Sequence, residues 1–212
     1  MSIRSVSLVL LVFCLGLVLP VARAQSAAMA PVILVLGDSI SAGYGLDAGQ
    51  GWVRLLEQKL KTHGAPHRVV NASVTGETTA GGLARLPALL GRHKPSVVLV
   101  ELGGNDGLRA LPVKAMRGNV ERIVELSRQA GAEPVLFEMR IPDNYGPTYT
   151  DAFARAFTDV ARERKVAMVP FLLMRFAADP KYFQDDGIHP GPEAQPQILD
   201  AVWPTLAPLI KH

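Results

Sequence analysis

Four short stretches of the chain carry the residue types that acyl-transfer chemistry needs. Ser39 lies three residues after the apolar run 32–36, and Asn105 follows a second apolar run at 96–102. Asp186 and His189 stand three residues apart near the C-terminal end. A serine hydroxyl becomes a nucleophile when a histidine takes its proton, and a carboxylate orients that histidine. Asp186 and His189 are therefore a candidate acid and base for Ser39.

The same stretches offer hydrogen-bond donors for the oxyanion of a tetrahedral intermediate. Gly76 has no side chain, so a substrate can approach its backbone N–H closely. Asn105 offers a side-chain N–H, and the backbone N–H of Ser39 is a third candidate donor. Each residue alone is better explained as a turn former or a helix cap. Their joint placement after successive predicted strands favours the catalytic interpretation.

Strands and helices alternate five times along the chain. The predicted strands are the apolar runs 32–36, 67–70, 96–102, 135–139 and 166–169. The predicted helices cover 52–61, a segment from Thr78 or Thr79 through Leu90, 113–130, 150–164 and 193–210, the last one delayed or kinked by Pro196 and Pro204. This alternation predicts an α/β fold with a parallel sheet between helices. Because parallel strands end at one edge, the candidate residues are expected to meet there.

The first 24 residues have the composition of a signal peptide. Arg4 supplies a basic start, residues 6–19 are almost wholly apolar, and residues 22–24 form a small-x-small cleavage site. We expect cleavage after Ala24, which leaves residues 25–212 as a single hydrolase domain in the periplasm or outside the cell. Cys14, the only cysteine, lies in this segment, so the mature protein is expected to form no disulfide.

Charge and spacing argue against several other classes of protein. The net charge of +3 falls to +1 when the two arginines of the signal segment are removed, which leaves no basic excess for nucleic acid. His63 and His67 are four residues apart, but Gly64 and Pro66 between them argue against a helical metal site. We therefore predict no metal site.

Other hydrolase patterns fit less well. Ser41 occupies the position where a nucleophile elbow, Gly-x-Ser-x-Gly, requires its second glycine. Glu77, Glu101 and Glu138 lie near predicted strand ends and are candidates for a glycosidase pair, but the sequence fixes no distance between them.

The four stretches resemble the blocks of the SGNH (GDSL-type) hydrolase family. The blocks appear here as residues 37–41, the loop around Gly76, residues 104–106 around Asn105, and residues 186–189. The resemblance covers residues 31–212. Longer runs, such as 100–108 and 184–190, are most similar to the bacterial group of periplasmic multifunctional thioesterases, proteases and lysophospholipases and of arylesterases.

The resemblance implies a flavodoxin-like three-layer α/β/α fold with a five-stranded parallel sheet. It implies Ser39, Asp186 and His189 as the catalytic triad, and the Ser39 N–H, the Gly76 N–H and the Asn105 side chain as the oxyanion hole. It further implies esterase, thioesterase and lysophospholipase activity on small-molecule acyl esters and thioesters, with transient contact with lipid substrates. No metal or organic cofactor is implied.

Apolar residues after the third and fourth predicted strands are candidates for a substrate groove. They are Leu108, Leu111, Ile141, Pro142 and Tyr145. Ordinary core packing explains these residues equally well.

Two alternative functions stay open at this stage. A carbohydrate O-acetylesterase on the same scaffold would lose activity as the acyl chain lengthens. A non-catalytic module that binds lipid or carbohydrate would bind without turnover, and it would have no need for the complete set of catalytic residues.

Overall fold

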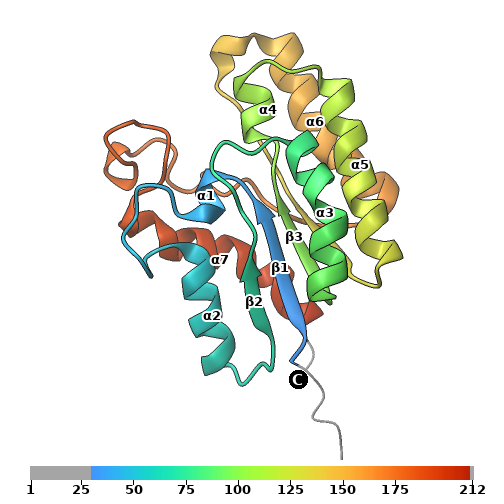
Figure 1. The fold of residues 1–212 in the computed structure, drawn as a ribbon. Helices are drawn as coiled ribbons and strands as arrows, with labels where there is room; N and C mark the ends of the chain where they lie inside the picture. The colour runs from blue at the N-terminus through green and yellow to red at the C-terminus, as the bar shows by residue number, and fades with distance from the viewer. Residues whose placement is uncertain (1–29, 211–212) are drawn as a thin grey trace, which may run out of the picture.

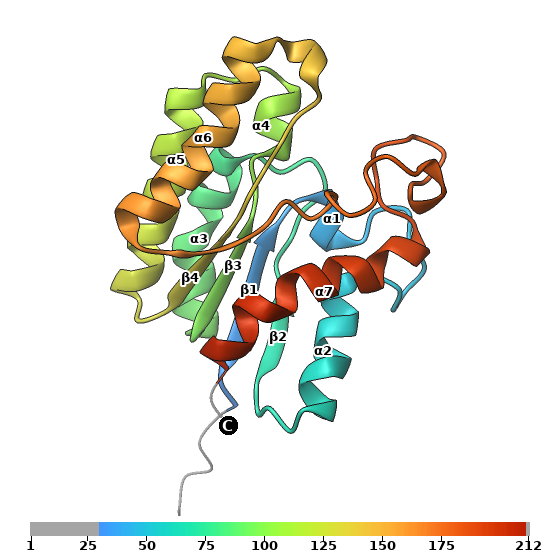
Figure 2. The same ribbon diagram turned by 180° about the vertical axis from the view of Figure 1, so that it is seen from behind.

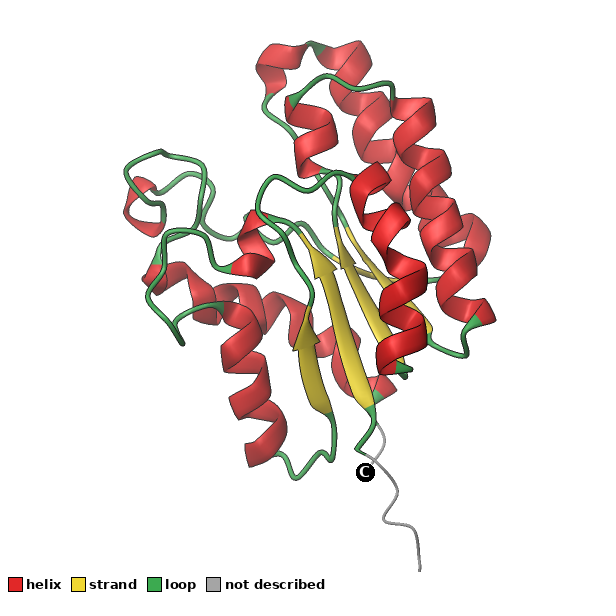
Figure 3. Ribbon diagram, in the orientation of Figure 1, coloured by secondary structure: helices red, strands yellow, loops and turns green. Residues whose placement is uncertain are grey.

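A five-stranded parallel sheet forms the centre of the protein in the computed structural model, which describes residues 30–210 (Figures 1 and 3). Its order is β2-β1-β3-β4-β5, and every neighbouring pair is parallel. The strands are β1 (Val32–Gly37), β2 (Arg68–Asn71), β3 (Val97–Glu101), β4 (Glu133–Phe137) and β5 (Ala167–Val169). The predicted signal peptide, its cleavage site and Cys14 lie outside the described residues.

Helices cover both faces of the sheet (Figures 1 and 2). On one face α3 (Thr79–His93), α5 (Val113–Gln129) and α6 (Pro147–Arg164) pack side by side, and on the other α2 (Trp52–Thr62) packs against α7 (Gln195–Leu206). Two short helices, α1 (Ser39–Ala42) and α4 (Gly104–Leu108), follow strands β1 and β3 almost directly. Single 3₁₀ turns are η1 (Asp143–Tyr145), η2 (Pro180–Tyr182), η3 (Pro192–Ala194) and η4 (Ala207–Leu209).

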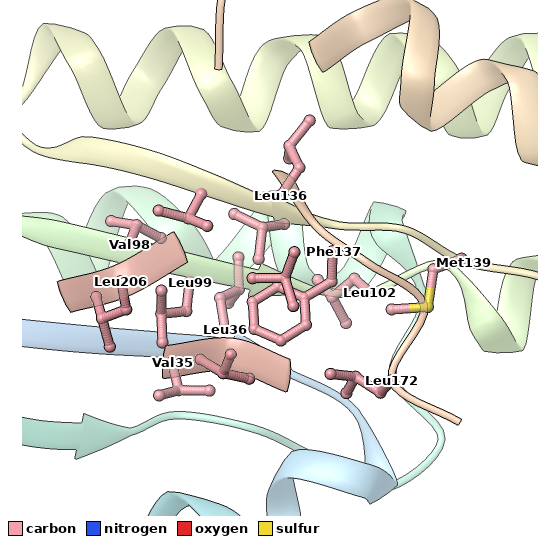
Figure 4. Close-up of a cluster of buried hydrophobic side chains, with 14 of the residues drawn as sticks. Val35, Leu36, Val98, Leu99, Leu102, Leu136, Phe137, Met139, Leu172 and Leu206 are labelled. Atoms are coloured by element: carbon pink, nitrogen blue, oxygen red, sulfur yellow. The ribbon is translucent and has the colours of Figure 1, made fainter. Parts of the chain in front are cut away.

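The central strands are buried along their whole length. Every residue of β1 and β3 is buried, as expected for parallel strands that are covered on both faces. Figure 4 shows Leu36, Leu99 and Phe137 from three adjacent strands in one cluster, together with Leu206 of α7. This core fixes the ends of β1 and β3, from which α1 and α4 start.

The predicted fold class is confirmed, and the bounds of some elements differ from the prediction. Strand β4 begins at Glu133, where its backbone N–H donates to Ser96 O (2.8 Å), two residues earlier than predicted. Helix α6 begins at Pro147 because proline, which lacks an N–H, is well suited to the first helical position. Helix α4 was not predicted. Among residues 30–210, no helix has the length and apolar character required to span a bilayer.

Candidate active site

The candidate nucleophile, Ser39, is the first residue of helix α1. Asp38 caps this helix, since its Oδ1 accepts a hydrogen bond from the Ile40 N–H (3.1 Å). Gly43 ends the helix after a single turn in the left-handed conformation (φ 76°). The backbone therefore turns sharply at the end of β1, and Ser39 is left partly exposed at the sheet edge.

The candidate base and acid lie on one short loop. The Oδ2 atom of Asp186 is 2.6 Å from His189 Nδ1, and its Oδ1 accepts hydrogen bonds from the N–H groups of Ile188 and His189, both at 2.9 Å. These hydrogen bonds, those from the backbone and side chain of His189 first, lower the pKa of Asp186 to about 2. Asp186 is therefore ionised at neutral pH and fixes the orientation of the imidazole.

Ser39, His189 and Asp186 form a continuous row of hydrogen bonds. His189 Nε2 lies 2.9 Å from Ser39 Oγ, so the imidazole joins the hydroxyl on one side to the carboxylate on the other. This contact joins residues that are 150 positions apart in the chain. The geometry suits proton transfer from the serine through Nε2.

Two glutamines hold the His189 loop against the rest of the fold. The carbonyl of Pro190 accepts hydrogen bonds from both Gln184 Nε2 and Gln195 Nε2, each at 3.2 Å. Gln184 Nε2 also donates to Tyr44 O (2.7 Å), and the Tyr44 ring lies 4.5 Å from the His189 ring. The sequence analysis missed these residues, because only long-range contacts reveal their part in the site.

The candidate oxyanion donors lie at the same edge of the sheet. Asn105 sits in helix α4, and its Nδ2 donates to Asp38 Oδ2 (3.1 Å), so the side chain reaches the residue next to Ser39. Gly76 has a left-handed backbone (φ 77°) in a loop that the Val74 N–H ties to Gly37 O (3.0 Å).

Helix α4 begins in a conformation that requires glycine. Gly103 has φ 121°, and a Cβ atom there would lie 2.5 Å from Phe157 Cζ. Only glycine fits this turn, which directs Asn105 from the end of β3 towards Ser39.

The five predicted substrate-binding residues have different environments. Leu108 and Leu111 are 42% and 37% exposed, and Pro142 is also exposed. Tyr145 is half-buried and donates its hydroxyl to Leu108 O (2.8 Å). Ile141 is buried and belongs to the core cluster, in keeping with the core-packing explanation.

The three glutamates considered as a glycosidase pair lie in separate environments. Glu77 pairs with Arg85 at 2.7 Å, and Glu138 pairs with Arg140 at 2.8 Å. Glu101 is fully buried at the end of β3 and accepts a hydrogen bond from Ser41 Oγ (2.6 Å). Residues 30–210 contain no group of three or more histidine, cysteine, aspartate or glutamate side chains arranged to hold a metal ion.

A parallel α/β/α sandwich with serine, histidine and aspartate in one hydrogen-bonded row at its carboxyl edge has the architecture of a serine hydrolase. Residues 35–195 match the GDSL-like Lipase/Acylhydrolase family. The chain belongs to this family.

Several relatives align with most of this chain. The Esterase TesA of Pseudomonas aeruginosa is 50% identical over 93% of this chain and 96% of its own. The Thioesterase 1/protease 1/lysophospholipase L1 of Escherichia coli (strain K12) is 45% identical over 88% of each chain. A similar solved structure is that of the psychrotrophic esterase EstA from Pseudoalteromonas sp., inhibited by monoethylphosphonate. Its sequence is 41% identical, the match covers 84% of this chain and 97% of the EstA chain, and the TM-score is 0.80.

Two buried carboxyl groups lie next to helix α1: Asp38 caps the helix, and Glu101 accepts a hydrogen bond from Ser41 Oγ (2.6 Å). Burial raises the pKa of Asp38 to about 6, and burial together with the nearby Asp38 raises the pKa of Glu101 well above 4.5. The folded protein therefore keeps a proton on Glu101 at pH values where the unfolded chain has released it. The free energy of unfolding falls as the pH rises above about 4.5, because the unfolded state binds fewer protons.

Replacing Glu101 should remove its share of this pH dependence. We expect Glu101→Gln to become more stable relative to the unaltered protein as the pH rises from about 5 to about 8, because glutamine does not titrate. Urea unfolding at both pH values measures the change, and Glu133→Gln, at an exposed position, is the control that should follow the unaltered protein. Equal pH slopes for Glu101→Gln and the unaltered protein would contradict the assignment.

Proposed function

We propose that this protein is a serine esterase and thioesterase that acts through an acyl-enzyme on Ser39. The observation that carries the proposal is the unbroken row of hydrogen bonds from Ser39 through His189 to Asp186. Such a row needs no metal or organic cofactor to activate the hydroxyl. The names of the relatives, which include esterase, thioesterase and lysophospholipase, agree with this function.

The reaction follows from the positions of the three side chains. Ser39 Oγ attacks the carbonyl carbon of the ester while His189 Nε2 takes its proton, and the ionised Asp186 stabilises the imidazolium. His189 then gives the proton to the departing alcohol or thiol. Water enters, loses a proton to the same nitrogen and releases the acid from Ser39.

The negative charge of the tetrahedral intermediate is stabilised by three N–H donors. These are the backbone N–H groups of Ser39 and Gly76 and the side-chain amide of Asn105. Asn105 Nδ2 carries two hydrogens, so one can bind Asp38 while the other faces the oxyanion. Loss of one such donor typically lowers turnover by about 10²–10³-fold.

The exposed apolar side chains near the site favour an apolar acyl group. Leu108 and Leu111 follow Asn105 in the chain and are exposed, as is Pro142, and Tyr145 donates its hydroxyl to Leu108 O. The buried Ile141 is the weakest of the five candidates for substrate contact. The substrates are small-molecule acyl esters and thioesters, with transient contact with lipid substrates. We further propose that the signal peptide is cleaved after Ala24 and that the enzyme acts in the periplasm or outside the cell.

Replacing the nucleophile tests the assignment directly. We expect Ser39→Ala in residues 25–212 to abolish hydrolysis of nitrophenyl esters from acetyl to palmitoyl, because the acyl-enzyme forms on Ser39 Oγ, the hydroxyl that contacts His189 Nε2. Ser96→Ala, far from the site on the opposite edge of the sheet, is the matched control and should keep full activity.

The ester series also separates the competing functions. Activity that holds or rises into medium chains supports the proposed function. Activity confined to the acetyl ester would favour a carbohydrate O-acetylesterase. Binding without serine-dependent turnover of any ester would favour a non-catalytic module.

The orienting role of Asp186 predicts a large loss of turnover. Asp186→Asn keeps the size of the side chain but weakens its hold on the His189 Nδ1–H, so the wrong tautomer becomes populated. We expect kcat to fall by about 10³–10⁴-fold with KM little changed. Steady-state kinetics on nitrophenyl butyrate measure this, and a kcat within about tenfold of the unaltered enzyme would remove Asp186 from the triad.

A further inference from the structure

We propose that Asp106 and Arg109 are positioning residues that join the two oxyanion donors, Gly76 and Asn105, into one rigid unit. Both belong to α4 or its C-terminal cap, the element that carries Asn105. Both reach across to the segment that carries Gly76. The inference rests on the proposed function of the site and adds residues to which no catalytic contact is assigned.

The buried half of this connection is the carboxylate of Asp106, the neighbour of Asn105. Asp106 is 2% exposed and accepts two hydrogen bonds from Thr79, one from its backbone N–H (2.8 Å) and one from its Oγ1 (2.6 Å). Thr79 Oγ1 in turn accepts a hydrogen bond from Asn119 Nδ2 (3.0 Å). Thr79 begins α3 only three residues after Gly76, so one carboxylate fixes the start of α3 to α4.

The exposed half of the connection is Arg109, which caps the end of α4. Its backbone N–H donates to Asn105 O (3.2 Å), and its Nη2 donates to Gly76 O (3.1 Å). A single residue thus contacts the backbone of both donor residues. The Gly76 backbone is left-handed, and glycine can readily leave this conformation because it has no side chain. The hydrogen bond from Arg109 therefore limits the backbone motion of Gly76.

The connection matters because an oxyanion donor acts only within a narrow range of distances. Its N–H must lie about 2.7–3.1 Å from the position of the oxyanion, and a shift of about 1 Å can lower the rate by about 10²-fold. On the nucleophile side Asp38 holds the Asn105 amide. Asp106 and Arg109 hold the opposite side, where Gly76 has to be kept in register with Asn105.

The exposed residue gives the sharper test, because its replacement leaves the core intact. We expect Arg109→Gln to lower kcat on nitrophenyl butyrate by about tenfold with KM within about twofold, since the lost contact affects the transition state. Arg109→Lys should restore most of the rate, because an ammonium group can also donate to Gly76 O. Arg122→Gln, an exposed arginine on α5 that pairs with Glu125, is the control and should be unchanged.

Asp106→Asn tests the buried half. The substitution keeps the shape of the side chain but places an NH₂ group against a Thr79 donor, so we expect kcat to fall by about tenfold or more. Thermal unfolding of each variant accompanies the kinetics. If Asp106→Asn does not fold, the arginine variants alone decide the proposal.

A comparison with Asn105→Ala separates this inference from the proposed function. If Asn105→Ala leaves kcat unchanged, the oxyanion assignment itself fails. If Asn105→Ala is slow, the double variant Arg109→Gln/Asn105→Ala should lose less than the product of the two single losses, because the two residues act on the same hole. A full product, an unchanged Arg109→Gln rate, or an Arg109→Lys rate as low as that of Arg109→Gln would each overturn the proposal.

Discussion

The site depends on the pairing of β1 with β3, which ends with Gly37 opposite Glu101. From this pair the two strands lead directly into α1 and α4, so Ser39 and Asn105 start from neighbouring points of the sheet. Asp38 connects the two helices, because its carboxylate caps α1 and also accepts a hydrogen bond from the side-chain amide of Asn105. The pairing and burial of both strands therefore position the candidate nucleophile and a candidate oxyanion donor.

The candidate acid and base, Asp186 and His189, come from a different part of the chain, and hydrogen bonds within their own loop hold them together. Asp186 accepts hydrogen bonds from two backbone N–H groups of its own turn and contacts the imidazole of His189, so one residue orders the loop and orients the candidate base. Gln184 and Gln195 then dock this loop through the Pro190 carbonyl. The arrangement places the candidate base, His189, against Ser39.

The sequence predicted the elements with strong periodicity and the edge where the candidate residues meet. Continuous apolar runs identified β1 and β3, and the predicted family and fold are confirmed. Helix α4 was missed because its five residues include Gly104 and Gly107 and show no helical period; tertiary hydrogen bonds from Asp106 to Thr79 fix its position. The parts played by Tyr44, Gln184 and Arg109 were missed because their contact partners are distant in the chain.

The 150-residue separation between Ser39 and His189 has a consequence for biosynthesis. The serine leaves the ribosome long before its base, and β1 can pair with β2 and β3 while the histidine is still untranslated. A nascent or truncated chain that ends before the His189 loop therefore carries the candidate nucleophile without the candidate base. On the proposed mechanism, hydrolysis therefore requires the segment that carries His189 to be docked beside Ser39.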